Sequence, residues 1–169
     1  MSLLVLQKQG RHKYFALASE DVATLLETLM GLSADSQPLR IITGPRDAAM
    51  RDARVCYNHL AGSRGIQLYD SLVASQHLIS KDGDILVSAN GRQFITDFGI
   101  DLQTLARSKA PLCRQCLDWS ERRSHLAGSC GRALLTRFEQ LKWLKPVGDS
   151  RAVKFSKRDL QKFNNTFSI

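Results

Sequence analysis

Apolar and polar residues alternate in short blocks along this chain, and the first blocks predict a β-hairpin. Residues 3–6 are apolar, residues 7–11 are polar and include Gly10, and residues 12–17 return to an apolar-rich run. Two β-compatible runs around a glycine-containing turn predict two antiparallel strands. A helix is expected next, because Ser19 is a typical N-cap and apolar residues recur at helical spacing over residues 22–30.

The strongest pattern in the chain is an internal repeat. The string HLAGSRG at residues 59–65 recurs as HLAGSCG at residues 125–131, a shift of 66 residues with six of seven positions identical. Leu68 and Leu78 also meet leucines at the same offset. Such a match indicates the duplication of one structural unit.

Each copy is predicted to contain helix, turn, helix, hairpin and helix, which is the order of a winged helix. A first helix, with apolar positions from Met50 to Ala61, would end at the Ala-Gly pair, and a second would cover residues 67–77 or 132–142. The hairpin tips are expected at residues 80–84 and 147–151, and Ser88 and Ser156 should cap the last helices. Only 13 residues separate each turn glycine from the leucine before the hairpin, too few for a long reading helix. The copies are therefore expected to be structural, ligand-binding or dimer-forming.

The predicted fold class is mainly α with short β-hairpins (α+β): a winged-helix remnant followed by two winged-helix-like repeats. The expected segments are a wing and dimerisation helix at 1–32 and a polar, proline-containing linker at 33–46. The first repeat is placed at 47–105 and the second at 112–169.

The basic surplus of the chain is concentrated in its last third. The net charge is +8, and residues 113–169 hold 12 Lys and Arg against 5 Asp and Glu. Clustered cations attract a polyanionic partner, although a solvated basic face that only aids solubility would look the same. The chain shows neither a long apolar stretch nor a leader, and its four cysteines are too scattered for a disulfide scaffold, so a cytoplasmic protein with reduced thiols is expected.

Three strings resemble a known family. Residues 10–29, GRHKYFALASEDVATLLETL, closely resemble the wing and final dimerisation helix of the ArsR/SmtB family of bacterial repressors. Residues 43–62 and the string CLDWSERRSHLAG at 116–128 resemble the C-terminal extension of an ArsR-type subgroup.

The resemblance implies a homodimeric transcriptional repressor that binds operator DNA and answers to a small-molecule or metal inducer. The helix–turn–helix would precede residue 3. The wing residues expected to contact DNA are Lys8, Gln9, Arg11, His12 and Lys13.

Cysteine and histidine residues supply the candidate chemistry of the last two thirds of the chain. The residues expected to bind or sense a ligand are Cys56, His59, Cys116, Trp119 and His125. Cys113, Cys116 and His125 form a C-x2-C-x8-H arrangement with metal-ligand spacing, and Cys56, His59 and Cys130 are candidate partners in space. A structural zinc ion commonly takes four ligands in two close pairs, and the sequence shows one. The same residues would also serve as small buried side chains, so no cofactor is expected unless a metal binds here.

Neither the acidic residues nor any catalytic motif in the sequence indicates an enzyme. Asp118 and Glu121 stand three apart, the spacing of a capping box at the start of a helix. The sequence contains no nucleophile elbow, phosphate loop, HExxH or dinucleotide fingerprint. The leading hypothesis is a DNA-binding regulator; the alternatives are a ligand- or metal-binding sensory module and a sequence-independent nucleic-acid-binding protein that uses residues 113–169.

Overall fold

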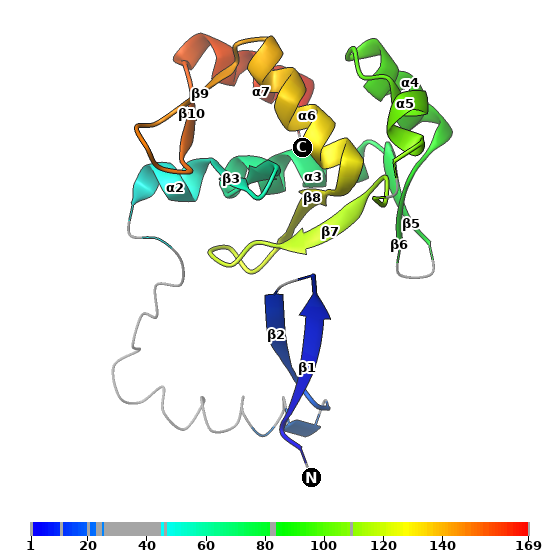
Figure 1. The fold of residues 1–169 in the computed structure, drawn as a ribbon, viewed down its shortest axis with the longest axis vertical. Coiled ribbons are helices and arrows are strands. Elements are labelled where there is room, and N and C mark those ends of the chain that lie inside the picture. Colours follow the sequence, from blue (N-terminus) through cyan, green and yellow to red (C-terminus); the bar gives the residue numbers. More distant parts are fainter. Residues whose placement is uncertain are drawn as a thin grey trace. The chain divides into compact units, whose positions relative to one another are not determined.

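The chain forms two compact units, Met1–Ile42 and Thr43–Ile169. Figure 1 shows them in a computed structural model, which describes residues 2–10, 12–19, 21–22, 25, 45, 47–81, 84–108 and 110–168. None of the helices in this described part of the chain is long and apolar enough to cross a membrane.

The first unit begins with the predicted hairpin. Strands β1 (Leu4–Gln9) and β2 (His12–Leu17) pair antiparallel, with Lys8 opposite Lys13 next to the turn. The Ser19 hydroxyl accepts a hydrogen bond from the Val22 N–H at 3.4 Å, as expected of an N-cap. Of the helix predicted after Ser19, residues 21, 22 and 25 are described and helical. The other residues of that helix, the linker up to residue 44 and Arg11 lie outside the described residues.

The second unit contains two copies of one arrangement, hairpin, helix, hairpin and helix, preceded by the short helix α2 (Ala48–Asp52). The first copy consists of β3 (Arg54–Cys56), β4 (His59–Ala61), α3 (Ser63–Ala74), β5 (Leu78–Lys81), β6 (Asp84–Val87) and α4 (Ala89–Asp97). Helix α5 (Leu102–Ala106) connects the copies. The second copy consists of β7 (Arg114–Leu117), β8 (Ser124–Ala127), α6 (Gly128–Gln140), β9 (Leu144–Pro146), β10 (Val153–Phe155) and α7 (Lys157–Thr166).

The prediction of a mainly α fold is wrong. The described residues form ten strands, paired into five two-stranded antiparallel sheets, beside six helices. The difference arises before the Ala-Gly pair of each repeat: in the first repeat the predicted helix is confined to α2 and hairpin β3/β4 follows it, and in the second repeat hairpin β7/β8 stands in its place. Helices α3 and α6 therefore each follow a hairpin, and not a helix as the winged-helix order predicts.

The reason for this error is that the apolar pattern is short and fits the periodicity of a helix as well as that of a strand. Ala53, Leu60 and Ala61 are buried as expected, but Tyr57 is 60% exposed at a two-residue turn. Tyr57 adopts a left-handed conformation, with φ of 57°, and Asn58 follows it, so the chain reverses after Cys56. A run this short cannot distinguish a helix from a strand by periodicity alone.

The second helix of each repeat begins earlier than predicted, at Ser63 and Gly128. Gly65 and Gly131 therefore lie inside helices, where they permit a close approach of backbones. A Cβ added to Gly131 would overlap the Leu126 carbonyl and would meet the His59 Cβ at 3.4 Å. A Cβ added to Gly65 would meet the Leu60 carbonyl oxygen at 2.5 Å and the His125 Cβ at 3.6 Å.

We expect Gly131→Ala to lower the free energy of unfolding by about 1–3 kcal/mol, because the helix must move away from strand β8. Chemical denaturation followed by circular dichroism measures this change. Arg132→Ala, at the next and exposed position, is the control and should change stability by less than about 0.5 kcal/mol. Equal stabilities of the two variants would contradict the close approach.

The later parts of each repeat follow the sequence prediction. Strands β5 and β6 pair from Leu78 to Val87, and β9 and β10 pair from Leu144 to Phe155, which confirms both hairpins. The Ser88 hydroxyl accepts from the Gly91 N–H at 2.9 Å, and the Ser156 hydroxyl accepts from the Asp159 N–H at 3.2 Å, which confirms both caps.

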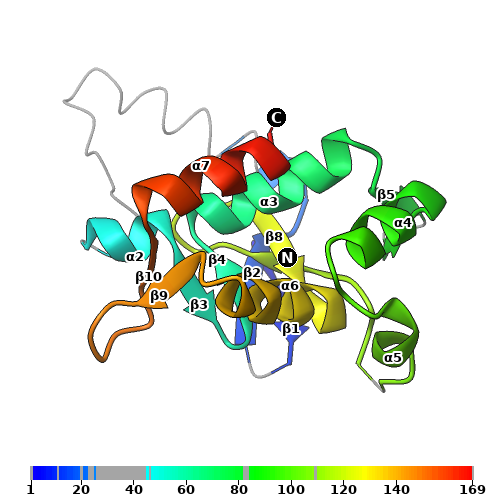
Figure 2. The same cartoon turned by 90° about the horizontal axis from the view of Figure 1, so that it is seen from above.

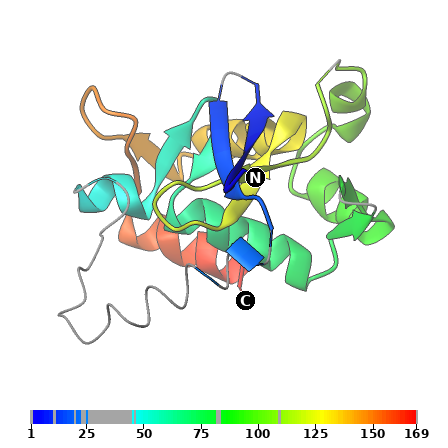
Figure 3. The same ribbon diagram turned by 90° about the horizontal axis from the view of Figure 1, so that it is seen from below.

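The two repeats share one hydrophobic core and exchange packing partners. Helix α3 packs on β8 of the other repeat, and α6 packs on β4. Figures 2 and 3 show α3 and α6 on opposite sides of hairpins β3/β4 and β7/β8. Helix α7 lies along α3, where Gln67 Nε2 donates to the Phe167 carbonyl at 3.1 Å and the Ser71 hydroxyl donates to the Ser168 carbonyl at 2.9 Å. This exchange brings the first hairpins of the two repeats together.

Candidate metal centre

The first hairpin of each repeat presents one cysteine and one histidine side by side. In β3/β4, Cys56 is the register partner of His59, and in β7/β8, Cys116 is the register partner of His125. Directly opposed residues of an antiparallel pair project from the same face and lie close enough to act together. Each hairpin therefore presents two possible metal ligands, a thiol and an imidazole, and we call each such pair of side chains a pincer.

The two pincers meet in the interior between the repeats. One ligand atom from each of Cys56, His59, Cys116 and His125 lies within 4.8 Å of all the others. The two Nε2 atoms of His59 and His125 are 3.1 Å apart. His59, Cys116 and His125 are buried and Cys56 is half-buried. Two thiols and two imidazole nitrogens are thus held together away from bulk water.

The outer nitrogen of each imidazole faces an oxygen. His59 Nδ1 lies 3.4 Å from Asn58 Oδ1, and His125 Nδ1 lies 3.8 Å from Asp118 Oδ2. The second distance is longer than a hydrogen bond, and His125 Nδ1 has no hydrogen-bond partner although it is buried. Because the Nδ1 atom of each ring is turned toward an oxygen, the two Nε2 atoms are the ring nitrogens that face each other.

A buried ion pair fixes the second pincer to the first. Arg54 Nη2 donates to both carboxylate oxygens of Asp118 at 2.7 Å, and the two side chains are 1% and 0% exposed. The Gly62 N–H donates to Asp118 Oδ2 at 2.8 Å, and the Ser120 hydroxyl donates to Oδ1 at 2.6 Å. Burial raises the pKa of Asp118, but the hydrogen bonds from Ser120, Gly62 and Arg54 outweigh it and hold this pKa well below its usual value.

Asp118 therefore does not begin a helix, and the predicted capping box is wrong. Its carboxylate does accept from the N–H groups of Ser120 and Glu121, at 2.9 and 3.2 Å. These bonds close a turn between β7 and β8, because the segment leads into a strand rather than a helix.

The thiols of the cluster have unequal acidity. The pKa of Cys56 lies well below its ordinary value, first because the Cys116 thiol donates a hydrogen bond to it and then because His125 and His59 face it. The same contact, together with burial, raises the pKa of Cys116. One of the two sulfurs is thus readily available as a thiolate, the form that coordinates metals.

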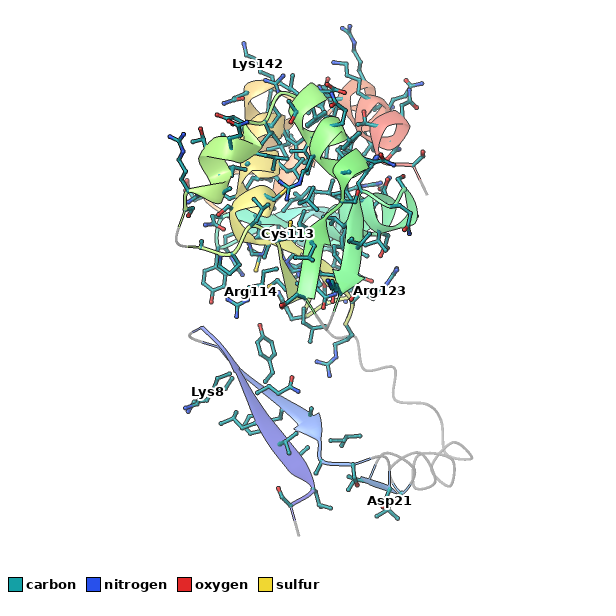
Figure 4. All side chains as sticks on the ribbon, turned by 90° about the vertical axis from the view of Figure 1, so that its right-hand side faces the viewer. Lys8, Asp21, Cys113, Arg114, Arg123 and Lys142 are labelled. Atoms are coloured by element: carbon teal, nitrogen blue, oxygen red, sulfur yellow. The ribbon has the colours of Figure 1, made fainter. Side chains whose placement is uncertain are left out.

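The structure brings together four of the five residues expected to bind or sense a ligand. Trp119, the fifth, is 43% exposed and carries Arg54 over its ring at 5.1 Å. Cys113, the first residue of the predicted C-x-x-C, is not part of the cluster; it interacts with Cys130 through a hydrogen bond that lowers the pKa of Cys113. Figure 4 shows Cys113 within the second unit.

The sequence contained one signal for the cluster of Cys56, His59, Cys116 and His125, but the offset between the two repeats changes within it and concealed the signal. The histidines are 66 residues apart, whereas the cysteines are 60 apart, because the segment between cysteine and histidine is six residues longer in β7/β8 (117–124) than in β3/β4 (57–58). Aligning the repeats on the hairpin register matches Arg54 with Arg114 and Cys56 with Cys116. The role of Arg54 had no sequence signal, because its partner lies 64 residues away.

Comparison with known proteins gives the family. No family model matches the chain, and no solved structure matches it. An uncharacterized HTH-type transcriptional regulator of Bacillus subtilis (strain 168), YdfF, is 33% identical over 154 residues, which are 91% of this chain and 68% of the relative. The chain belongs to the HTH-type transcriptional regulators. The aligned stretch is longer than the second unit, so it includes residues of both units.

Proposed function

We propose that this regulator is an ArsR-type, DNA-binding repressor that acts as a homodimer. Its β1/β2 hairpin contacts the phosphate backbone, and its second unit serves dimerisation and signal reception. The relative supports a DNA-binding regulator in general. The resemblance of residues 10–29 to an ArsR wing supports the narrower assignment.

One observation on the hairpin carries the proposed DNA contact. Lys8 and Lys13 are exposed and stand directly opposite each other in register. Like charges in this position weaken a strand pair, and the phosphates of a bound nucleic acid would neutralise them. Figure 4 shows Lys8 projecting from the hairpin.

A second lysine pair provides a matched comparison within the same chain. Lys145 and Lys154 face each other on β9/β10, and both are exposed. They belong to the basic residues 113–169, which would carry binding if the protein were instead a sequence-independent nucleic-acid-binding protein. The cations of this segment are spread over the second unit: Arg114 and Arg123 lie at one end and Lys142 at the other (Figure 4).

Because phosphate contacts do not read bases, we expect binding through the β1/β2 hairpin to be weak and to show no sequence preference, and the double variant Lys8→Glu/Lys13→Glu to weaken it further. Losing two phosphate contacts should reduce the slope of log affinity against log salt by about 2. Fluorescence anisotropy with two duplexes of unrelated sequence, over a series of salt concentrations, measures both quantities.

The double variant Lys145→Glu/Lys154→Glu is the control and should keep most of the salt slope. If it abolishes binding while the Lys8/Lys13 variant does not, the wing assignment is wrong and residues 113–169 carry the contact. Strong, sequence-selective binding by this chain at physiological salt would contradict the expected weak binding.

A further inference from the structure

We propose that Cys56, His59, Cys116 and His125 bind one zinc ion in a tetrahedral Cys₂His₂ site. The ligands are the two thiolates and the two Nε2 atoms, so each repeat contributes one cysteine and one histidine. The site lies between hairpins β3/β4 and β7/β8 of the second unit and is independent of the DNA contact proposed for the first.

The spacing of the ligand atoms fits a zinc ion. Zinc binds sulfur at about 2.3 Å and imidazole nitrogen at about 2.0 Å, so the edges of a regular tetrahedron measure about 3.3–3.8 Å. The four ligand atoms lie within 4.8 Å of one another, and the two Nε2 atoms are 3.1 Å apart. Closing the site around an ion therefore requires only small side-chain movements.

Charge balance also favours a divalent ion. Two thiolates and Zn²⁺ sum to zero, so a filled site can be buried without an unpaired charge. The adjacent Arg54–Asp118 pair is also neutral, and both of its side chains are buried. Asn58 Oδ1 and Asp118 Oδ2 lie on the outer side of the imidazoles, where oxygens orient the rings of metal-bound histidines.

The ligand set indicates a structural rather than a catalytic site. Four protein ligands complete a tetrahedron and leave no position for water or substrate. Sulfur and imidazole in a tetrahedral arrangement favour zinc over Mg²⁺ or Ca²⁺, which prefer oxygen. Because two ligands come from each repeat, the ion would join hairpin β3/β4 to hairpin β7/β8.

The remaining cysteines supply an internal comparison. Cys113 and Cys130 are also buried and interact with each other, but the described residues place no histidine in a metal-binding group with them. A thiol pair alone offers two ligands, and zinc sites commonly use four. Cys113→Ser therefore removes a buried thiol of the same unit without touching the proposed site.

Metal analysis of the full chain, purified without chelators or added metal, tests the proposal. We expect one zinc per chain in the wild type and in Cys113→Ser, and less than about a tenth of that in Cys56→Ser and His59→Ala. His59→Cys should retain zinc, because a thiolate can replace the imidazole as fourth ligand. Such a rescue separates loss of a ligand from loss of the fold.

X-ray absorption at the zinc edge of the wild-type chain needs no variant. We expect two sulfur neighbours at about 2.3 Å and two nitrogen neighbours at about 2.0 Å. Replacement of zinc by Co²⁺ should give the absorption bands of a tetrahedral, thiolate-bound ion.

Four results would overturn the proposal. They are a wild-type chain without metal, retention of zinc by Cys56→Ser and His59→Ala, retention of copper or iron instead of zinc, and a Cys56–Cys116 disulfide in protein purified under reducing, anaerobic conditions.

Discussion

Replacing Asp118 with alanine is expected to lower the free energy of unfolding of the second unit by about 3–5 kcal/mol. The substitution leaves the guanidinium of Arg54 buried without a counter-charge, and Arg54 is only 1% exposed. It also removes the acceptor of the Gly62 N–H, which lies between strand β4 and helix α3. Removing one partner of a buried pair is more harmful than removing both, since the remaining charge has lost its compensation.

A double-mutant cycle measures this coupling. Arg54→Met should cost a similar amount, because it leaves the Asp118 carboxylate unpaired, and the double variant Arg54→Met/Asp118→Leu should cost clearly less than the sum of the single changes. Asp149→Ala, at an exposed position of the β9/β10 loop, is the control and should change stability by less than about 0.5 kcal/mol. Additive single and double effects in thermal or urea unfolding would show that the pair contributes no coupling.

Phe138→Ala is expected to cost about 3–5 kcal/mol of stability. Phe138 is fully buried in α6, and its ring centroid lies 5.9 Å from that of Phe98 and 5.7 Å from that of Phe167. Phe98 follows α4 in the first repeat, whereas Phe167 follows α7 in the second. The truncation would therefore leave a cavity where the last helices of both repeats meet.

The size of the cavity should determine the size of the effect. Phe138→Leu retains most of the apolar contact and should cost about 1–2 kcal/mol, while Leu86→Ala, at a position that is 44% exposed, should cost less than about 1 kcal/mol. Urea denaturation followed by tryptophan fluorescence measures all three. A loss below about 1 kcal/mol for Phe138→Ala would show that the cluster repacks around the smaller side chain.

Much of the local structure could be predicted because short-range signals decided it. The glycine turn of β1/β2 and the caps at Ser88 and Ser156 depend on residues within a few positions of each other. The hairpins β3/β4 and β7/β8 could not be predicted in this way. Their apolar residues fit helix and strand equally, and packing against α3 and α6 selected the strands.

The candidate site was harder to predict, because its residues are still farther apart in the sequence. The sequence indicated Cys56, His59, Cys116 and His125 as residues of interest, but the spacing pointed to Cys113 as a metal ligand. Cys113 instead interacts with Cys130, because it precedes the strand whose register places Cys116 opposite His125. Strand register, and not proximity in sequence, determines which cysteine faces the cluster.

By itself, the sequence determined that this protein contains a duplicated unit, several turns and caps, and a basic hairpin that resembles a wing. It could do so because each of these features is written in adjacent residues or in an identical string. Only the tertiary structure decided that the two repeats exchange packing partners, that Arg54 neutralises Asp118 across 64 residues, and that two cysteine–histidine pairs converge. These contacts depend on how two hairpins meet in three dimensions. The turn of β7/β8 is longer than that of β3/β4, so no constant spacing along the sequence relates the residues that meet.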